Sequence, residues 1–448
     1  MRISVVGLGK LGAPLLAVLA SRGFEVCGID LNQRSVDAIN SQKAPVVEPH
    51  LQELLSAHGE RVRATTDWQA GIEGTDITCI IVPTPSGADG AFRNEFVLDA
   101  VESIGSALRN KAGYHLVVVH STTMPGSVGG PIKERLEAAS GKRVGGELGL
   151  CYNPEFIALG NVVEGLLNPD FVLIGESDEH AGDVLVGLYR RVVGDSVPIS
   201  RMSFVNAELA KISVNTYVTM KISFANMLGE ICDNLEGADA DVVTRAIGQD
   251  TRIGGKYLKG GTGYGGPCFP RDTIAFAVAG QRANVDAVLA TATHTVNQRQ
   301  VDRLAKLVGE HAASGETVAV MGLSYKPGTN VIEESQGVLL AAALAKAGYR
   351  VVVHDPAGMD AAQAVLGPNA SFAAAPEQAI ADATVVVVMV PWPEYRQFFS
   401  GYRGSDRARV IIDCWRLIEP ESAAGLAVIQ LGSNKPAEIR PFAVAAAN

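Results

Sequence analysis

The glycine pattern Gly7-x-Gly9-x-x-Gly12 constrains the fold of this chain more than any other short feature. It follows an apolar run at residues 3–6 and opens a stretch that is typical of a helix. Glycines at this spacing permit a tight turn and let a pyrophosphate approach backbone N–H groups at the helix N-terminus. Asp30 closes the next apolar run, where a ribose-binding carboxylate is expected. The pattern predicts a dinucleotide-binding α/β unit; an α/β turn without a ligand is the alternative.

Asp30 also indicates which dinucleotide is bound. Its carboxylate would accept hydrogen bonds from ribose hydroxyls and would repel a 2′-phosphate, so the sequence favours NAD over NADP. The other residues expected around this cofactor are Leu11, Arg34, Thr84, Pro85 and Thr122.

Short apolar runs alternate with helical stretches in two blocks of the chain. Such alternation predicts α/β architecture, with parallel sheets covered by helices on both faces. The runs expected as strands are 3–6, 25–29, 77–82, 116–119 and 171–174 in the first block, and 318–322, 350–354 and 384–390 in a second block that begins near residue 316.

The chain changes character near residue 201. Residues 203–236 hold no proline and one glycine, and Ser203 suits the N-cap of a helix. A helix of this length is expected to bridge domains or to pair with a second subunit. Further helix is expected over residues 271–310.

Composition excludes several classes of partner and location. The formal net charge of −10 argues against nucleic acid or an anionic membrane as the main partner. The longest apolar runs are too short to span a bilayer. Residues 3–6, directly after Met1, have the pattern of a buried strand and not that of a signal peptide, so a cytoplasmic location is expected. Six widely spaced cysteines form no Cys-x-x-Cys pair, which predicts reduced thiols and no metal site.

One cysteine stands apart from the other five. Cys268 follows a glycine-dense loop at residues 260–266, where the backbone is expected to approach something closely. It also precedes a helical stretch, and a helix N-terminus lowers a thiol pKa from its usual value of about 8.5. Asp272 lies four residues later, one helical turn along. A buried, inert cysteine beside a flexible loop is the alternative; the loop favours a nucleophile.

Lys211 and Asn215 stand at i and i+4 on the long predicted helix and therefore share a face. Their neighbours on that face are mostly small or apolar, so the cation and the amide can face a ligand. The alternative is a solvated face on which Lys211 pairs with Glu208. Polar turns at residues 82–86, 121–126 and 152–156 follow or join strands, where open α/β sheets bind ligands.

Taken together, these residues resemble the UDP-glucose/GDP-mannose dehydrogenase family. The resemblance runs from the glycine pattern to the segment Asp413-Cys414-Trp415-Arg416, and the sequence GGTGYGGPCFPRD at 260–272 is its most specific part. It implies two Rossmann-like parallel-sheet domains joined by a central long-helix region. Residues 1–200 would bind NAD, 201–310 would form a helical dimerisation domain with the cysteine loop, and 311–448 would bind the nucleotide sugar. A homodimer through the long helix is expected.

The resemblance also implies roles for individual residues. Cys268 matches the nucleophile, and Lys211 and Asp272 match a pair that steadies charge and orders water. Asn215 matches an oxyanion or substrate contact, Glu155 a general base, and Thr122 a contact for water or a proton. The substrate contacts that it implies are Glu155, Phe156, Lys211, Asn215, Arg252, Tyr257, Gly265, Phe269, Lys326 and Arg416, with Arg252 offered to a neighbouring subunit's substrate.

The implied reaction is a four-electron, NAD-dependent oxidation of the C6 alcohol of a nucleotide sugar, through a thiohemiacetal and a thioester on Cys268. UDP-glucose is the first expectation. UDP-N-acetylhexosamines and GDP-mannose stay open, because Leu159, Val331 and Glu333 depart from the family pattern in segments that lie near the sugar nucleotide in the family.

Two other classes of function are weighed. A two-electron hydroxyacid dehydrogenase of the 6-phosphogluconate type would need neither the cysteine loop nor the second α/β block. A non-catalytic sensor of NAD or of nucleotide sugars would need none of the cysteine, lysine, asparagine and aspartate set.

Overall fold

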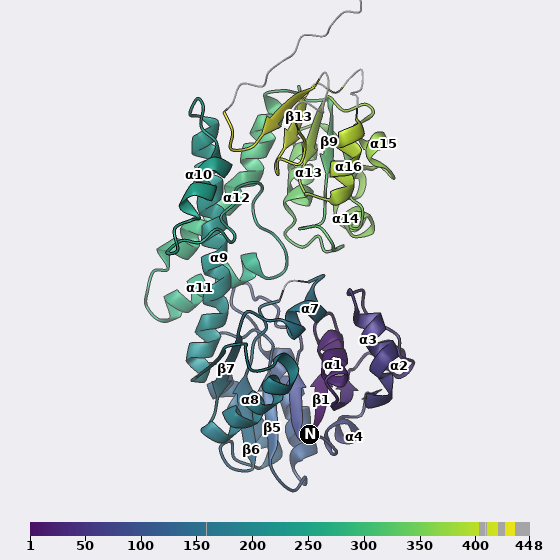
Figure 1. Ribbon diagram of the computed structural model, residues 1–448, viewed down its shortest axis with the longest axis vertical. Coiled ribbons are helices and arrows are strands. Elements are labelled where there is room, and N and C mark those ends of the chain that lie inside the picture. The colour runs from purple at the N-terminus through teal and green to yellow at the C-terminus, as the bar shows by residue number, and fades with distance from the viewer. Residues whose placement is uncertain (158, 403–407, 409, 420–425, 435–448) are drawn as a thin grey trace, which may run out of the picture. The chain divides into compact units, whose positions relative to one another are not determined.

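The structure, a computed structural model, describes residues 1–157, 159–402, 408, 410–419 and 426–434. It divides into two compact units. The first comprises Met1–Ser213 and Val278–Asn284, and the second comprises Val214–Ala277 and Val285–Asn448. Each unit contains one extended sheet with helices packed against it (Figure 1).

The sheet of the first unit has the strand order β3-β2-β1-β4-β5-β6-β7-β8. Its strands are β1 Arg2–Val6, β2 Glu25–Ile29, β3 Val62–Thr65, β4 Ile77–Ile80, β5 His115–Val119, β6 Leu148–Tyr152, β7 Val172–Glu176 and β8 Ile199–Met202. Neighbouring strands are parallel except for β6 and β7, which pair antiparallel. The order of the first six is the one that dinucleotide-binding folds use.

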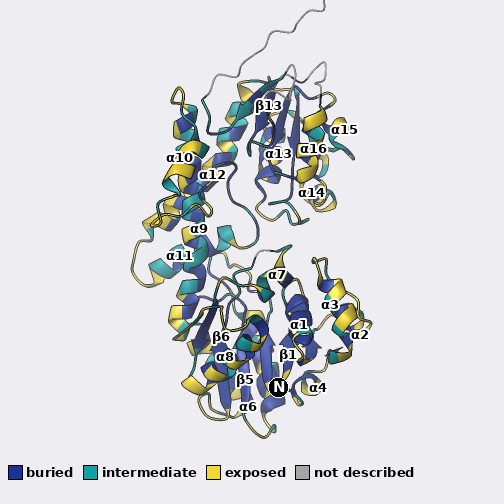
Figure 2. Ribbon diagram, in the orientation of Figure 1, coloured by how far each residue is buried: buried dark blue, intermediate teal, exposed yellow. Residues whose placement is uncertain are grey.

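Helices cover both faces of this sheet. They are α1 Gly12–Ser21, α2 Gln33–Asn40, α3 Leu51–His58, α4 Trp68–Ile72, α5 Glu95–Leu108, α6 Lys133–Ser140, α7 Val162–Leu167 and α8 Glu179–Val193. Successive strand residues point to opposite faces. Ile3 and Val5 accordingly enter one apolar core, which includes α1 and α8, whereas Val6 enters the other, which includes α5. The central strands are buried on both sides (Figure 2), which explains their uninterrupted apolar sequences.

The second unit repeats the same strand order in a wholly parallel sheet, β11-β10-β9-β12-β13-β14. Its strands are β9 Thr317–Met321, β10 Arg350–His354, β11 Ser371–Phe372, β12 Val385–Val388, β13 Val410–Asp413 and β14 Ala427–Gln430. Its helices beside the sheet are α13 Gln336–Lys346, α14 Met359–Leu366, α15 Pro376–Ile380 and α16 Pro393–Gly401. The prediction of two parallel α/β sheets is confirmed.

Four helices lie between the two sheets in sequence: α9 Phe204–Asp233, α10 Ala240–Ile247, α11 Phe269–Arg282 and α12 Val288–Gly309. Helix α9 begins directly after Ser203, as predicted, and spans 30 residues. The helix expected over 271–310 is present as two helices, α11 and α12, with a break between them. Asn284 has a φ of +56°, and an α-helix cannot pass through this left-handed conformation. Among the residues placed by the structure, no helix is long and apolar enough to cross a membrane.

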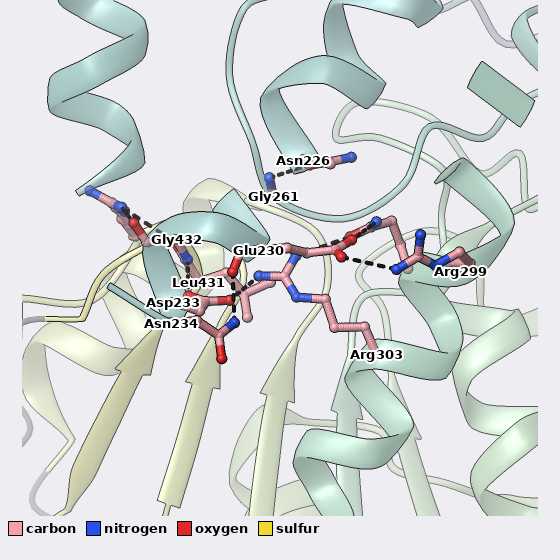
Figure 3. A network of polar contacts seen from close by, with 11 residues as sticks. Asn226, Glu230, Asp233, Asn234, Gly261, Arg299, Arg303, Leu431 and Gly432 are labelled. Carbon is pink, nitrogen blue, oxygen red and sulfur yellow. Dashed lines mark hydrogen bonds and ion pairs between the residues drawn. The ribbon is translucent and has the colours of Figure 1, made fainter. Parts of the chain in front are cut away.

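Polar contacts join α9, α12 and the segment after β14 within the second unit (Figure 3). Asp233 forms an ion pair with Arg303 and accepts a 2.7 Å hydrogen bond from the N–H of Gly432. Glu230, one turn earlier, lies 3.3 Å from the guanidinium of Arg299. These contacts fix the C-terminal half of α9 against the helix that leads into the second sheet.

Candidate active site

The glycine turn after β1 packs tightly against its own chain on one side. A Cβ at Gly7, whose φ is +91°, would lie 2.2 Å from the carbonyl oxygen of Ile81, and one at Gly12 would lie 1.7 Å from that of Gly7. At Gly9 a Cβ would have none of the described atoms within 4 Å. The outer glycines are therefore required by the fold, and the middle one leaves an open face at the start of α1. A dinucleotide pyrophosphate fits this face.

Asp30 is held beside the same turn. Its Oδ2 accepts a 2.6 Å hydrogen bond from the N–H of Leu8, and its Oδ1 accepts one of 2.8 Å from Asn32. A carboxylate has about four acceptor positions, so this half-buried group can still accept ribose hydroxyls.

The other predicted cofactor residues follow the carboxyl ends of β1, β2, β4 and β5, where the strand order reverses and open sheets bind ligands. Leu11 precedes α1, and Arg34 is exposed in the first turn of α2. Thr84 is buried and Pro85 exposed after β4, and Thr122 is half-buried after β5.

The second sheet uses its equivalent aspartate differently. Asp355 follows β10 and is only 2% exposed. It accepts hydrogen bonds from the N–H groups of Leu323, Ser324 and Gly358 and from the indole of Trp392. Burial would raise its pKa, but the backbone N–H groups outweigh burial and hold the pKa below its usual value. Because the chain itself satisfies Asp355, only the first sheet presents an aspartate that is available to a ribose.

Glu208 anchors the start of α9 to the turn after β5. This fully buried carboxylate accepts hydrogen bonds from the Thr123 hydroxyl at 3.1 Å and from the N–H groups of Gly126 and Val128 at 2.7 and 2.9 Å. Burial raises its pKa, and these donors oppose the shift. Both oxygens thus serve the 123–128 turn. The sequence indicated Glu208 only as an alternative partner of Lys211; its contacts with the turn have no sequence signal beyond a carboxylate among apolar neighbours.

Lys211 lies one turn further along α9 and is 5% exposed. Its ammonium lies 4.9 Å from the centre of the Phe156 ring, a distance at which a cation interacts with an aromatic face. Phe156 adjoins Glu155, whose Oε1 lies 3.2 Å from Nδ1 of His120. The first unit therefore brings Lys211 together with the segment that carries the predicted base.

Cys268 is the exposed cysteine and immediately precedes α11. The other five are buried, as predicted: Cys27, Cys79, Cys151, Cys232 and Cys414. The N–H of Asp272 donates to the carbonyl of Cys268 over 2.8 Å, which places the two residues one helical turn apart. The buried Asp272 carboxylate accepts a 2.6 Å hydrogen bond from the side-chain amide of Asn215. Cys268, Asp272 and Asn215 thus form one constellation within the second unit.

Two buried asparagines hold the glycine loop before Cys268. Asn226 of α9 accepts from the N–H of Gly261 at 2.9 Å (Figure 3) and donates to the carbonyl of Thr262 at 3.0 Å. Asn297 of α12 accepts from the N–H of Tyr264 at 2.7 Å and donates to its carbonyl at 3.0 Å. Each amide thereby satisfies two peptide groups that would otherwise be buried without partners. Neither residue was predicted from the sequence, although asparagine inside a helix is a weak signal.

The glycines of this loop approach the chain's own backbone. A Cβ at Gly265 would lie 2.3 Å from the carbonyl oxygen of Glu334, and one at Gly266, whose φ is +85°, would lie 2.6 Å from the Tyr325 ring. The N–H of Gly266 also donates to the carbonyl of Glu333 over 2.9 Å. The close approach expected of the loop is therefore made, at these two positions, to the segment that follows β9.

Three of the predicted substrate contacts, Phe269, Tyr257 and Lys326, each lie beside an aromatic ring of the second unit. The ring of Phe269 meets that of Tyr257 edge-on at 6.2 Å. Tyr257 has a φ of +61° and is 54% exposed. The ammonium of Lys326 lies 5.8 Å from the ring of Tyr325, which packs on Gly266.

The two predicted arginine contacts are placed differently. The Arg252 side chain is 86% exposed and pairs with Asp250 at 2.6 Å. Arg416 is largely buried, pairs with Asp239 at 2.6 Å, and donates to the carbonyls of Leu431 and Gly432. Its guanidinium joins the start of α10 to the segment after β14, so the structure shows a stabilising contact there, and its substrate role stays a prediction.

Three models of one protein family match the chain. The UDP-glucose/GDP-mannose dehydrogenase family matches through its NAD binding domain at residues 1–193, its central domain at 205–299 and its UDP binding domain at 319–420. The chain belongs to this family. It is therefore an NAD-dependent oxidoreductase of the nucleotide-sugar dehydrogenase class, and the predictions of family, enzyme class and cofactor are confirmed.

Relatives named for different nucleotide sugars resemble the chain. It is 35% identical over 422 residues to the UDP-glucose 6-dehydrogenase AglM of Haloferax volcanii, covering 93% of this chain and 97% of that protein. It is also 35% identical over 359 residues to a GDP-mannose 6-dehydrogenase of Pseudomonas syringae pv. syringae, covering 79% and 81%. The solved UDP-glucose dehydrogenase of Pyrobaculum islandicum has a TM-score of 0.88 at 32% identity, covering 96% and 97%. The UDP-D-ManNAc dehydrogenase of Pyrococcus horikoshii, at 24% identity and a TM-score of 0.84 over 97% and 100%, shares the fold.

The three residues that depart from the family pattern make their local contacts through a backbone carbonyl or in the apolar core. The carbonyl of Val331 accepts a 2.9 Å hydrogen bond from the N–H of Tyr325, and the carbonyl of Glu333 accepts one from the N–H of Gly266. Leu159 packs against the core that includes α1. These local contacts do not require the family's usual side chains, so the departures are compatible with the same fold.

Proposed function

We propose that this chain oxidises the C6 primary alcohol of a nucleotide sugar to a carboxylate through a thioester on Cys268. The observation that carries the proposal is the exposed thiol at the start of α11, with the Asp272–Asn215 pair one turn along. A structural cysteine would be buried, as the other five are. A reactive one needs exposure and a helix N-terminus.

Bound NAD would accept one hydride from C6 in each of two oxidations, one NAD molecule per hydride, and the proton lost in each oxidation would pass to a base. In this scheme the Cys268 thiolate attacks the aldehyde carbon, a C–S bond forms, and the thiohemiacetal keeps the reactive aldehyde on the enzyme. Loss of the second hydride converts this adduct to a thioester. Water then adds to the thioester carbonyl, the C–S bond breaks, and the carboxylate leaves as the thiol is restored. Four electrons leave the sugar, so each substrate consumes two NAD.

Other side chains of the chain are proposed to meet the needs of these steps. Oxyanions form on both the thiohemiacetal and the hydrolysis intermediate, and Lys211 and the amide of Asn215 are the proposed donors. Water needs a base, for which Asp272 and Glu155 are the candidates. Thr122, in the turn after β5, is proposed to contact water or the transferred proton.

The remaining assignments complete the proposed site. Gly7, Gly9, Leu11, Gly12, Asp30, Arg34, Thr84, Pro85 and Thr122 are proposed to contact NAD. Glu155, Phe156, Lys211, Asn215, Arg252, Tyr257, Gly265, Phe269, Lys326 and Arg416 are proposed to contact the nucleotide sugar. The domain limits proposed are 1–200, 201–310 and 311–448.

UDP-glucose is the substrate proposed first. Two relatives that match nearly the whole chain, from Haloferax volcanii and Pyrobaculum islandicum, are named for UDP-glucose. The test is NADH formation with UDP-glucose, UDP-GlcNAc, UDP-ManNAc and GDP-mannose. We expect two NADH per UDP-glucose consumed. Two NADH formed from another of these sugar nucleotides would identify that compound as the substrate instead. One NADH per sugar would indicate a two-electron dehydrogenase, and no NADH with any of them would favour a sensor.

We also propose a homodimer through α9. Large apolar side chains on this helix are 42–58% exposed at positions that recur every three to seven residues: Tyr217, Phe224, Met227 and Ile231. Such a stripe suits a helix face that packs against another helix. Light scattering should give twice the chain mass, and Phe224→Glu with Ile231→Glu should give monomers.

The buried reduced cysteines agree with the proposed cytoplasmic location.

A further inference from the structure

The carboxylate of Glu155 is held by a buried cluster that the proposed mechanism does not use. Its Oε1 lies 3.2 Å from Nδ1 of His120, which follows β5, and 3.4 Å from the hydroxyl of Tyr189 on α8. The side chain of His120 is 3% exposed and that of Glu155 is 16% exposed. Both donors therefore meet the same oxygen of a carboxylate that keeps some contact with solvent.

Tyr189 cannot hold this oxygen firmly on its own. A phenol has one proton to donate, and the Tyr189 hydroxyl makes its shorter contact with Oδ1 of Asn153. Asn153 is itself fixed, because its amide donates to the carbonyl of Leu173 over 2.8 Å. His120 is therefore the group that can give Glu155 a full hydrogen bond.

The surroundings of His120 favour its charged form. Burial lowers its pKa, but the contacts with Cys79 of β4 and with Glu155 outweigh burial and raise the pKa to about 10. Tyr189 is the other titratable group that faces this carboxylate. An imidazolium donates a stronger hydrogen bond to a carboxylate than a neutral donor does.

We propose that His120 is a positioning residue that holds Oε1 of Glu155 so that Oε2 is presented to the reacting water or substrate. Among the described residues, no hydrogen bond is made to Oε2. The next residue, Phe156, lies against the Lys211 ammonium, so a fixed Glu155 also fixes the neighbour of that cation. This inference rests on the proposed function, in which Glu155 serves as a base.

Three variants separate positioning from packing. His120→Leu removes the donor and the charge, His120→Asn keeps an N–H donor without charge, and His120→Lys keeps both. For His120→Leu we expect kcat to fall on the order of 10- to 100-fold, with KM for NAD and for UDP-glucose within about threefold. The pH profile of kcat should also change, because the charged neighbour of the carboxylate is gone. His120→Lys should recover most of kcat, and His120→Asn part of it.

The opposite outcomes are distinct. An unchanged kcat and pH profile in folded His120→Leu would overturn the inference. A second contradicting result would be an equal loss of kcat in all three variants, in proportion to the folded protein that each has lost. Circular dichroism measures that folded fraction, and such a pattern would indicate that His120 acts by packing alone. Wild-type enzyme assayed in parallel separates this result from failure of the proposed function, which would show as no NADH from the wild type.

A measurement on the pair does not depend on turnover. The chain has eight histidines, so isotope-labelled imidazoles can be titrated by NMR and His120 assigned by its absence in His120→Asn. In the wild type we expect His120 to stay protonated above pH 8. In Glu155→Gln it should lose its proton at a lower pH than in the wild type. Identical titration in the two proteins would overturn the ion pair and with it the positioning role.

Discussion

The side-chain amide of Asn215 on α9 donates a 2.6 Å hydrogen bond to Oδ2 of Asp272 on α11, one turn after Cys268. This bond fixes the orientation of the amide that is proposed to donate a hydrogen bond to the oxyanion. Asn215→Ala should therefore lower kcat by roughly 10²- to 10³-fold, as loss of one oxyanion donor does. Steady-state NADH formation measures the effect. Asn234→Ala, just beyond the same helix, is the control and should keep wild-type kcat; an Asn215→Ala enzyme with normal kcat would remove the amide from the mechanism.

The Lys211 ammonium is expected to stabilise negative charge near the reacting carbon. Lys211→Ala should lower kcat on the order of 10²-fold or more. Lys306→Ala on α12 replaces an exposed lysine and should be near wild type. If Lys211→Ala retains its kcat, the lysine has no part in the chemistry.

Asn297 satisfies both peptide groups of Tyr264 in the buried glycine loop. Asn297→Ala leaves the N–H of Tyr264 buried without its partner, at about 1–3 kcal/mol, and leaves its carbonyl with only the 3.5 Å contact from Gln336. We expect a lower midpoint of urea unfolding and a lower kcat, because the loop that carries Cys268 loses its support. The exposed Asn369 offers a matched control, Asn369→Ala. Equal midpoints for the two variants would contradict the role of Asn297.

His115 should make the first unit sensitive to acid. Burial, followed by the nearby Lys111 charge, lowers its pKa from 6.5 to about 3, and its Nε2 lies 2.8 Å from the Thr78 hydroxyl. The unfolded chain binds a proton below pH 6.5, whereas the folded chain does not until about pH 3. The free energy of unfolding therefore falls as pH falls through this window, by up to about 5 kcal/mol. Unfolding of His115→Gln should depend less on pH between 6.5 and 4; an unchanged dependence would contradict this.

Much of the fold could be predicted because the central strands are buried on both faces. Residues 385–388 are four valines with no exposed surface, and such runs are visible in sequence. Several of the missed strands lack this signature, although β6 and β13 are buried throughout. β8 has two exposed residues, Ser200 and Arg201, at the sheet edge, β11 has two residues, and β6 contains Gly149.

In the candidate site, too, some residues could be predicted from the sequence and others could not. Cys268, Asp272 and Asn215 were found because helical spacing and the glycine loop are local patterns. The contacts of Glu208, Asn226, Asn297 and His120 were missed because each joins segments more than 30 residues apart. Such pairings arise only when the chain folds, and a single sequence carries no spacing rule for them.

The central claim is that the sulfur of Cys268 carries the substrate between its two oxidations. The most direct measurement is NADH formation by Cys268→Ser with UDP-glucose, beside Cys232→Ala as a control at a buried cysteine. The account predicts two NADH per sugar at normal rate from the wild type and the control. It predicts that Cys268→Ser stalls, with product retained on the protein or held as the aldehyde. Sustained wild-type turnover by Cys268→Ser would contradict the thioester scheme.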